Sequence, residues 1–242
     1  MQEIEQKDTQ QRKGFRPRWY HFILIIVAIL LGSLLLFRFA AQRMLDKQIA
    51  ELKAEGYPVT LEELNESYSI PEDVENAADY VLKAYNSLAV DKEQIYEVDS
   101  LVYEQNEPNE YALQQLDKLI KQNQKSLTIL HKLTHIEHSR YPIDFTNGRN
   151  RSIEYLAEIR RLAQFLKLET LHYAYNGQSE KAIHSIEVME ALANTLDNVP
   201  SVVSYIVRMS LKALATKTCE RLLFQMELSQ HQPTELVKHV HG

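Results

Sequence analysis

Three histidines have the spacing in this chain that comes closest to a metal site. His131, His135 and His138 stand at i, i+4 and i+7, so on a continuous helix their rings would lie on one side and could reach one metal ion. The zinc-hydrolase pattern H-E-x-x-H needs a glutamate after the first histidine to activate water, and this chain has Lys132 there. Because the three residues also border an apolar stripe that ends near Leu130, packing is the favoured interpretation over metal binding.

An acidic segment from Leu61 to Glu110 is the second place where chemistry could arise. It holds fourteen Asp or Glu residues against Lys83 and Lys92, so it could attract a cation or a basic partner. No D-x-D-x-D-G calcium loop organises these carboxylates. We therefore interpret the segment as a solvated acidic face.

Motifs with an established catalytic mechanism do not occur in the sequence. There is no glycine-rich phosphate loop, no G-x-S-x-G elbow and no C-x-x-C pair. The single cysteine, Cys219, falls on a helical apolar stripe with Leu211, Ala215 and Leu222, which predicts a small packing residue rather than a nucleophile. The sequence therefore assigns no catalytic, cofactor-binding or metal-ligating residue.

The apolar run from Phe22 to Phe37 predicts where the protein sits. It is uncharged, and together with Trp19 and Tyr20 it reaches the roughly 17–25 residues that a helix needs to cross a bilayer. A cleaved signal peptide is the alternative. However, the run exceeds the about 7–15 residues of a signal core, and the bulky residues from Arg38 onward do not suit a cleavage site. We expect a retained, single-pass signal-anchor.

The charge distribution indicates orientation and partners. Five Lys or Arg residues precede Trp19, and three follow the apolar run within a short distance, which favours a cytoplasmic N-terminus and an extracytoplasmic C-terminal domain. The first 49 residues carry a net charge of +4, and the remainder of the −6 chain carries −10. Such an acidic domain would be repelled by nucleic acid, so the expected partners are the membrane and another protein. A lone cysteine suits, without proving, an extracytoplasmic location.

The elements that must position these residues are helical. Apolar residues recur at spacings of three and four from Ala41 to Leu52 and again after Pro71, and no alternating strand pattern appears. Gly56 followed by Pro58 ends the first helix, and Thr60 begins a capping box. We predict an all-α chain whose parts are a basic tail (1–18), a transmembrane helix (19–38), a juxtamembrane helix and linker (39–70, with a short helix at 61–66), and a helical domain (71–242) with helices near 72–88, 109–137, 151–176, 179–197 and 201–227.

Two segments resemble known proteins. Ala174 to Ile183, AYNGQSEKAI, resembles the centre of a tetratricopeptide helical hairpin, where Gly177 permits a tight turn and Ala182 lets the second helix approach closely. GYPVTLEEL (56–64), ENAA (75–78) and RYPID (140–144) resemble an uncharacterised family of single-pass bacterial proteins, which implies a bacterial origin and a helical extracytoplasmic domain but no activity. The resemblance also implies further helices after Gly242, and the sequence leaves open whether this chain is a shortened member.

Three hypotheses for function follow. The first is a non-enzymatic, membrane-tethered helical module of the bacterial envelope that binds protein or peptide. The second is a structural subunit of a larger envelope complex, and the third is a metal-dependent or hydrolase-like enzyme whose site is assembled from distant residues. The sequence favours the first because the anchor and the helical hairpin are present while catalytic motifs are missing.

Overall fold

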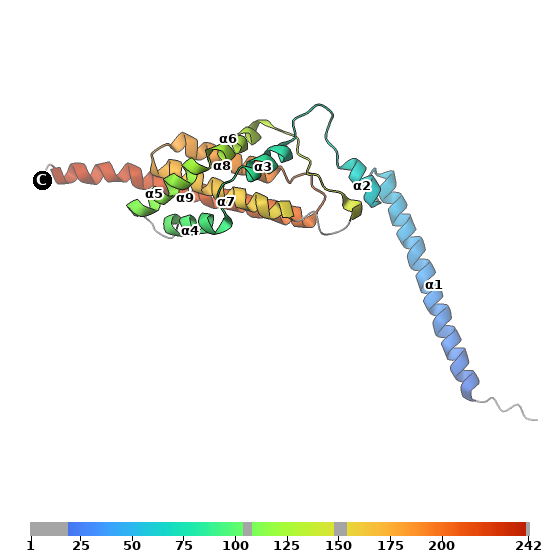
Figure 1. Ribbon diagram of the computed structural model, residues 1–242. Helices are drawn as coiled ribbons and strands as arrows, with labels where there is room; N and C mark the ends of the chain where they lie inside the picture. Colours follow the sequence, from blue (N-terminus) through green and yellow to red (C-terminus); the bar gives the residue numbers. More distant parts are fainter. Residues whose placement is uncertain (1–18, 104–107, 148–153, 241–242) are drawn as a thin grey trace, which may run out of the picture. The chain divides into compact units, whose positions relative to one another are not determined.

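The computed structural model describes residues 19–103, 108–147 and 154–240, and in the last helix it describes side chains as far as Phe224. Within these residues the protein is all-α, as the sequence predicted, with nine α-helices, two short 3-10 helices and no strand (Figure 1). The chain divides into two compact units, Met1–Val59 and Thr60–Gly242.

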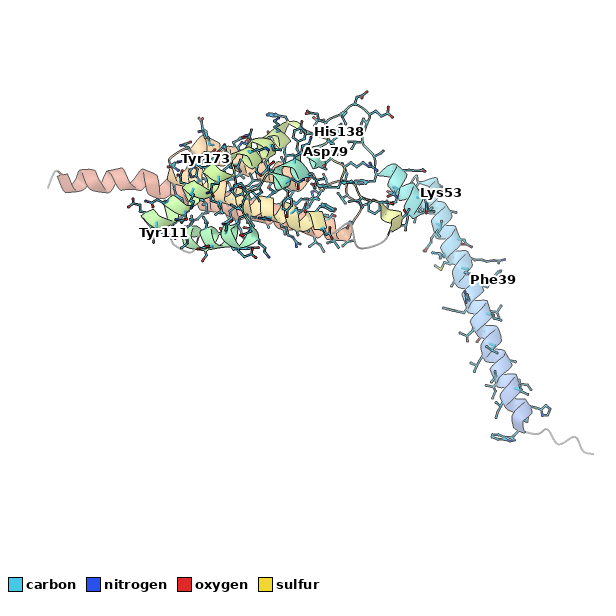
Figure 2. The ribbon with its side chains drawn as sticks, viewed as in Figure 1. Phe39, Lys53, Asp79, Tyr111, His138 and Tyr173 are labelled. Carbon is cyan, nitrogen blue, oxygen red and sulfur yellow. The ribbon has the colours of Figure 1, made fainter. Side chains whose placement is uncertain are left out.

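Helix α1, Trp19–Ala54, makes up the described part of the first unit. Its side chains, Phe39 and Lys53 among them, project outward around the helix (Figure 2), and its apolar residues are exposed. Gly56 ends the helix with φ +85°, the left-handed conformation that glycine adopts without strain. The predicted continuation beyond the apolar run is confirmed. Among the described residues, this is the one helix long and apolar enough to cross a membrane, and its most apolar 18-residue stretch has a mean hydropathy of 2.8.

The second unit begins with two capped helices. Thr60 accepts a hydrogen bond from the Glu63 amide at 3.1 Å and starts α2, Leu61–Ser67, which confirms Thr60 as the predicted N-cap. Asn76 caps α3, Ala77–Asn86, through the Ala78 amide. The observed helix is therefore shorter than the predicted one at 72–88, because it begins only after its N-cap, Asn76.

Helix α4, Lys92–Tyr103, corrects the interpretation of the acidic segment as a mere solvated face. Asp91 and Gln94 cap each other's amides at 2.8 and 3.2 Å. Ile95 and Val98 then turn inward at helical spacing and are buried. The signal was present in the sequence, but the many carboxylates on the outer face obscured it.

The predicted 109–137 helix is wrong as a single element. It comprises α5 (Glu110–Gln122), α6 (Gln124–Leu130) and the 3-10 helix η1 (His131–His135). Asn123 breaks the first two apart: it is fully buried, its amide NH₂ donates to the Leu119 carbonyl at 2.8 Å, and its oxygen accepts from the Ala89 amide at 2.7 Å. The break thus depends on a partner 34 residues away, which periodicity cannot show.

Three long helices complete the domain. They are α7 (Glu154–Tyr175), α8 (Ser179–Asn194) and α9 (Val202–Val240). The first two are close to the predicted ranges, whereas α9 continues to Val240, beyond the predicted end near 227. Gly177, at φ +67°, turns the chain between α7 and α8, and Ala182 is fully buried where the two helices meet. The predicted helical hairpin is confirmed. Because the chain reverses at each turn, α7 and α9 run in the same direction (Figure 1).

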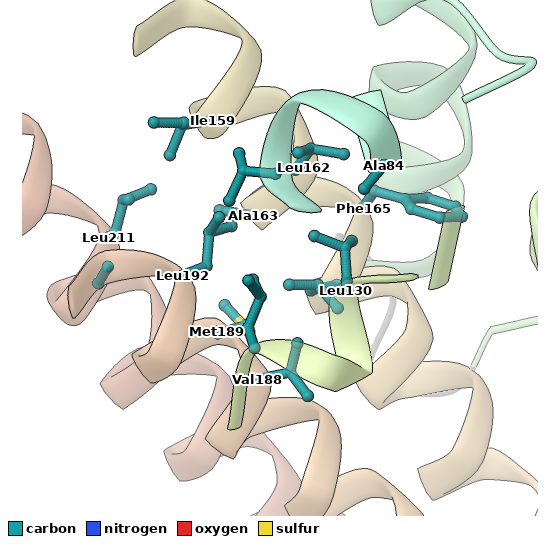
Figure 3. Packing of buried hydrophobic residues seen from close by; sticks show 14 of the residues in the cluster. Ala84, Leu130, Ile159, Leu162, Ala163, Phe165, Val188, Met189, Leu192 and Leu211 are labelled. Atoms are coloured by element: carbon teal, nitrogen blue, oxygen red, sulfur yellow. The ribbon is translucent and has the colours of Figure 1, made fainter. Parts of the chain in front are cut away.

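Helix α7 forms the centre of the core, and its apolar residues cover most of its circumference. All its residues from Phe165 to Leu171 are buried. Figure 3 shows Leu162 and Ala163 of this helix packed with Leu192 of α8 and Leu211 of α9. Leu130 of α6 and Ala84 of α3 belong to the same cluster.

An ordered connection, residues 138–144, joins η1 to the second 3-10 helix, η2 (Phe145–Asn147). Tyr141 is fully buried, stacks on Tyr155 at 4.5 Å between ring centroids and bonds Thr195 through its hydroxyl at 2.8 Å. Arg140 donates its Nε–H to the Tyr68 carbonyl, and Asp144 accepts from Asn65 at 2.8 Å. Arg140 and Asp144 therefore both contact the 61–68 segment, a packing that the sequence did not predict.

Candidate functional site

A groove of about 820 Å³ runs along α7 between the start of α4 and the middle of α9. This volume falls within the range of roughly 300–1,000 Å³ that is typical of ligand pockets. We call it the α4/α7/α9 groove and define it by Ile95 and Tyr96 of α4, Ala157 and Arg161 of α7, and Leu214 of α9, together with their neighbours.

Helical periodicity places the α7 residues on the groove. Glu154, Ala157, Arg161 and Gln164 recur at spacings of three and four, so they share one face of the helix. The opposite face carries residues such as Ile159 that are buried in the core. The same helix therefore anchors the domain and presents a partly polar face to the groove.

The walls contributed by α4 and α9 are largely apolar. Ile95 and Leu211 are each 2% exposed and form the base, where they belong to the hydrophobic core. Tyr96 is half exposed at the rim, with the Lys92 ammonium over its ring at 5.3 Å. Ala213 is small and exposed, so its side chain leaves the α9 side of the groove open.

The charge of the groove is opposite in sign to that of its domain. The unit Thr60–Gly242 contains 27 Asp or Glu and 18 Lys or Arg, a net charge of −9. The charged residues lining the groove are four basic and two acidic, a net charge of +2. The groove is therefore a local site for an anionic group on an acidic domain. The charged lining consists of Lys92, Arg160, Arg161 and Lys217 with Glu154 and Glu158.

Arg161 is the polar side chain of the groove best placed to bind a ligand. Its guanidinium lies over the Tyr85 ring at 5.6 Å. Its Nε is buried and has no hydrogen-bond partner among the residues that the structure describes. A buried donor left unpaired costs about 1–3 kcal/mol, so the environment of this guanidinium favours a nearby hydrogen-bond acceptor.

Two carboxylates occupy the end of the groove at the start of α7. Burial, followed by the nearby negative charge of Glu154, raises the pKa of Glu158 above its usual range. This carboxylate is partly desolvated and lies beside a like charge. A cationic group placed next to it would therefore stabilise its charged form and offset the cost of both.

A second polar cluster lies inside the helical packing. The Glu169 carboxylate is fully buried and contacts His131 Nε2 at 2.9 Å, and it accepts a hydrogen bond from the Ser185 hydroxyl at 2.9 Å. The serine and the imidazole both bind the carboxylate, whereas a nucleophilic triad requires the serine to bind the imidazole. This geometry ties η1, α7 and α8 together and does not activate Ser185.

The structure separates the three histidines of the predicted sequence pattern. The α-helix ends at Leu130, so the spacing no longer places the rings on one side. His131 binds Glu169, and His135 is exposed. The His138 backbone carbonyl accepts a hydrogen bond from the Ala77 amide at 2.8 Å. Across the described parts of the chain, no group of three or more His, Cys, Asp or Glu side chains is arranged to hold a metal ion.

Two further sequence predictions have different outcomes. One acidic-segment carboxylate, Asp99, forms an ion pair at 2.6 Å with Lys167, which is itself buried on α7. Cys219 is only half-buried, although Leu211, Ala215 and Leu222 of the same predicted stripe are buried.

Sequence reasoning missed the groove because its lining comes from four helices. The face of α7 from Glu154 to Gln164 was the one signal within a single segment.

Comparisons with protein-family models, with curated proteins and with solved structures find no match to this chain.

Proposed function

We propose that this protein is a membrane-anchored, non-enzymatic helical module that binds a protein or peptide in the α4/α7/α9 groove. The observation that carries the proposal is the groove itself, whose apolar base and charged rim resemble the centre and edge of protein interfaces. The neighbouring cluster around Glu169 supports a binding role over catalysis, because its hydrogen bonds hold helices together rather than prepare a nucleophile.

We further propose that α1 anchors the protein in the cytoplasmic membrane of a bacterium, with the helical domain outside the cytoplasm. The support is the excess of Lys and Arg before Trp19 and the length and hydropathy of α1. Alkaline phosphatase fused after Glu227 is expected to be active, and green fluorescent protein at the same site dark. The reverse pattern would place the domain, and its partner, in the cytoplasm.

Site-specific photo-crosslinking in living cells tests the binding role. A benzophenone amino acid at Ala157, which is exposed in the groove, should yield a discrete protein adduct. The same amino acid at Gln114, exposed on α5 and not part of the groove lining, serves as the matched control. Ala213→Trp, which fills the groove from the α9 side, should abolish the Ala157 adduct.

Two results would contradict the proposed function. One is the same adduct from both positions, which would show random encounter. The other is an Ala157 adduct that persists in Ala213→Trp, since the ligand would then occupy another surface. Circular dichroism of the purified variant establishes that the helical domain is intact.

A further inference from the structure

The groove continues as an exposed line along α9. Val203 and Ile206 precede Ser210, Ala213 and Lys217 at alternating spacings of three and four, so all five lie on one side of the helix. Val203 is 44% exposed and Ile206 57%. At a rise of about 1.5 Å per residue the line is about 21 Å long.

A parallel line on α7 accompanies it. Tyr155 of α7 bonds Ser204 of α9 at 3.1 Å, which sets the two helices side by side in register. The Ala157 side of α7 and the Ala213 side of α9 therefore border one trough with small side chains along it. The ridge of a third helix packs into such a trough between two parallel helices, and the small residues permit close approach.

The charges of the trough are ordered along its length. Glu154 and Glu158 lie where α7 begins. Arg160 and Arg161 follow along α7, and Lys217 lies towards the same end because α7 and α9 run in the same direction. The fourth basic residue, Lys92, lies on the α4 wall. The trough is thus acidic at one end and basic at the other.

We propose that the trough binds an amphipathic helix of a partner protein, about 15 residues long, with acidic residues in its first turn and basic residues in its last. Helices commonly carry this order of charges because it complements their own dipole. The acidic first turn then meets Arg161 and Lys217, and the basic last turn meets Glu154 and Glu158. Such a helix lies antiparallel to α7 and α9. This inference rests on the proposed function, because it specifies the ligand of the same groove.

A pair of synthetic peptides tests the inference against the full chain in nanodiscs of zwitterionic lipid. The first probe has a leucine–alanine ridge, glutamates in its first turn and lysines in its last. The mirror probe exchanges the two charges and is otherwise identical. Fluorescence anisotropy measures both affinities, and empty nanodiscs supply the membrane background. The first probe should bind at least about tenfold more tightly than the mirror probe, because like charges across an interface repel.

Charge reversal in the protein should invert this preference. The fourfold variant Arg161→Glu, Lys217→Glu, Glu154→Lys, Glu158→Lys keeps the net charge and should prefer the mirror probe. Lys121→Glu with Lys125→Glu, both exposed outside the groove, should leave the original preference unchanged. If the fourfold variant does not fold, Ala213→Trp takes its place and should weaken the first probe by at least about tenfold, since it removes the space a hot-spot side chain would fill.

Three outcomes would overturn the inference. Equal binding of the two probes would show that the charge order is irrelevant. Displacement of the first probe by soluble short-chain phosphatidylglycerol, below the concentration at which it forms micelles, would show that the trough binds an anionic lipid. Failure of both probes to bind while the Ala157 photo-adduct still forms would exclude this helical ligand but leave the proposed function intact.

A benzophenone group in the first probe tests, as a separate measurement, in which direction the bound helix lies along the trough. Placed in the first turn, it should label α9 near Lys217, and placed in the last turn it should label α7 near Glu154. The opposite pattern would refute the antiparallel arrangement.

Discussion

Tyr141→Ala should be among the most damaging single substitutions in the helical domain. The ring is fully buried, so its removal leaves a large cavity, and aromatic-to-alanine changes of this kind cost about 3–5 kcal/mol. The change also removes the stack on Tyr155, worth about 0.5–1.5 kcal/mol, and the hydroxyl bond to Thr195. Because these contributions overlap, we expect a loss of about 4 kcal/mol.

Thermal unfolding of the full chain in mild detergent measures the effect. The loss of the helical circular-dichroism signal with temperature gives Tm. For a domain of this size each kcal/mol lowers Tm by about 2–4 °C, so the expected fall is about 8–16 °C. Tyr141→Phe keeps the ring and loses only the hydrogen bond, so its Tm should fall by about 2–6 °C. Tyr205→Ala, exposed on α9, is the control. A Tyr141→Ala melting curve that overlies the control would refute the claim that this connection is part of the core.

Three further predictions concern buried polar groups. Asn123→Ala should lower the unfolding free energy by about 1–3 kcal/mol, because it leaves the Ala89 amide without its acceptor; an unchanged denaturation midpoint would contradict this. Lys167→Met should destabilise by about 1–3 kcal/mol, and adding Asp99→Leu should recover part of the loss in a double-mutant cycle, whereas strict additivity would show that the ion pair is unimportant. Burial lowers the pKa of His172 below its usual 6.5, so the unfolded chain binds the proton more readily and His172 reduces stability as the pH falls through 6.5. The wild type should therefore lose Tm relative to His172→Gln when the pH falls from about 7 to 5, and parallel Tm curves would exclude this linkage.

Local sequence signals were sufficient for the elements whose causes are local. The apolar stripe of α1, the Thr60 cap of α2 and the turn at Gly177 all depend on residues within a few positions of one another, and the structure contains each of them. The central position of α7 was also predictable, because a helix that is apolar on most of its circumference must be covered on most sides.

Only the tertiary structure decided features that depend on distant partners. Asn123, whose side chain binds Ala89, separates α5 from α6. The α-helix then gives way to a 3-10 helix after Leu130, and this removes the common face on which a three-histidine site would depend. The groove likewise exists because α4, α7 and α9 meet, so Arg161 and Lys217 share a surface although 56 positions separate them in the sequence. Periodicity reveals which side of each helix is apolar, but it contains no information about which helices pack together, since that choice is made by side-chain shape and hydrogen bonding across the assembled core.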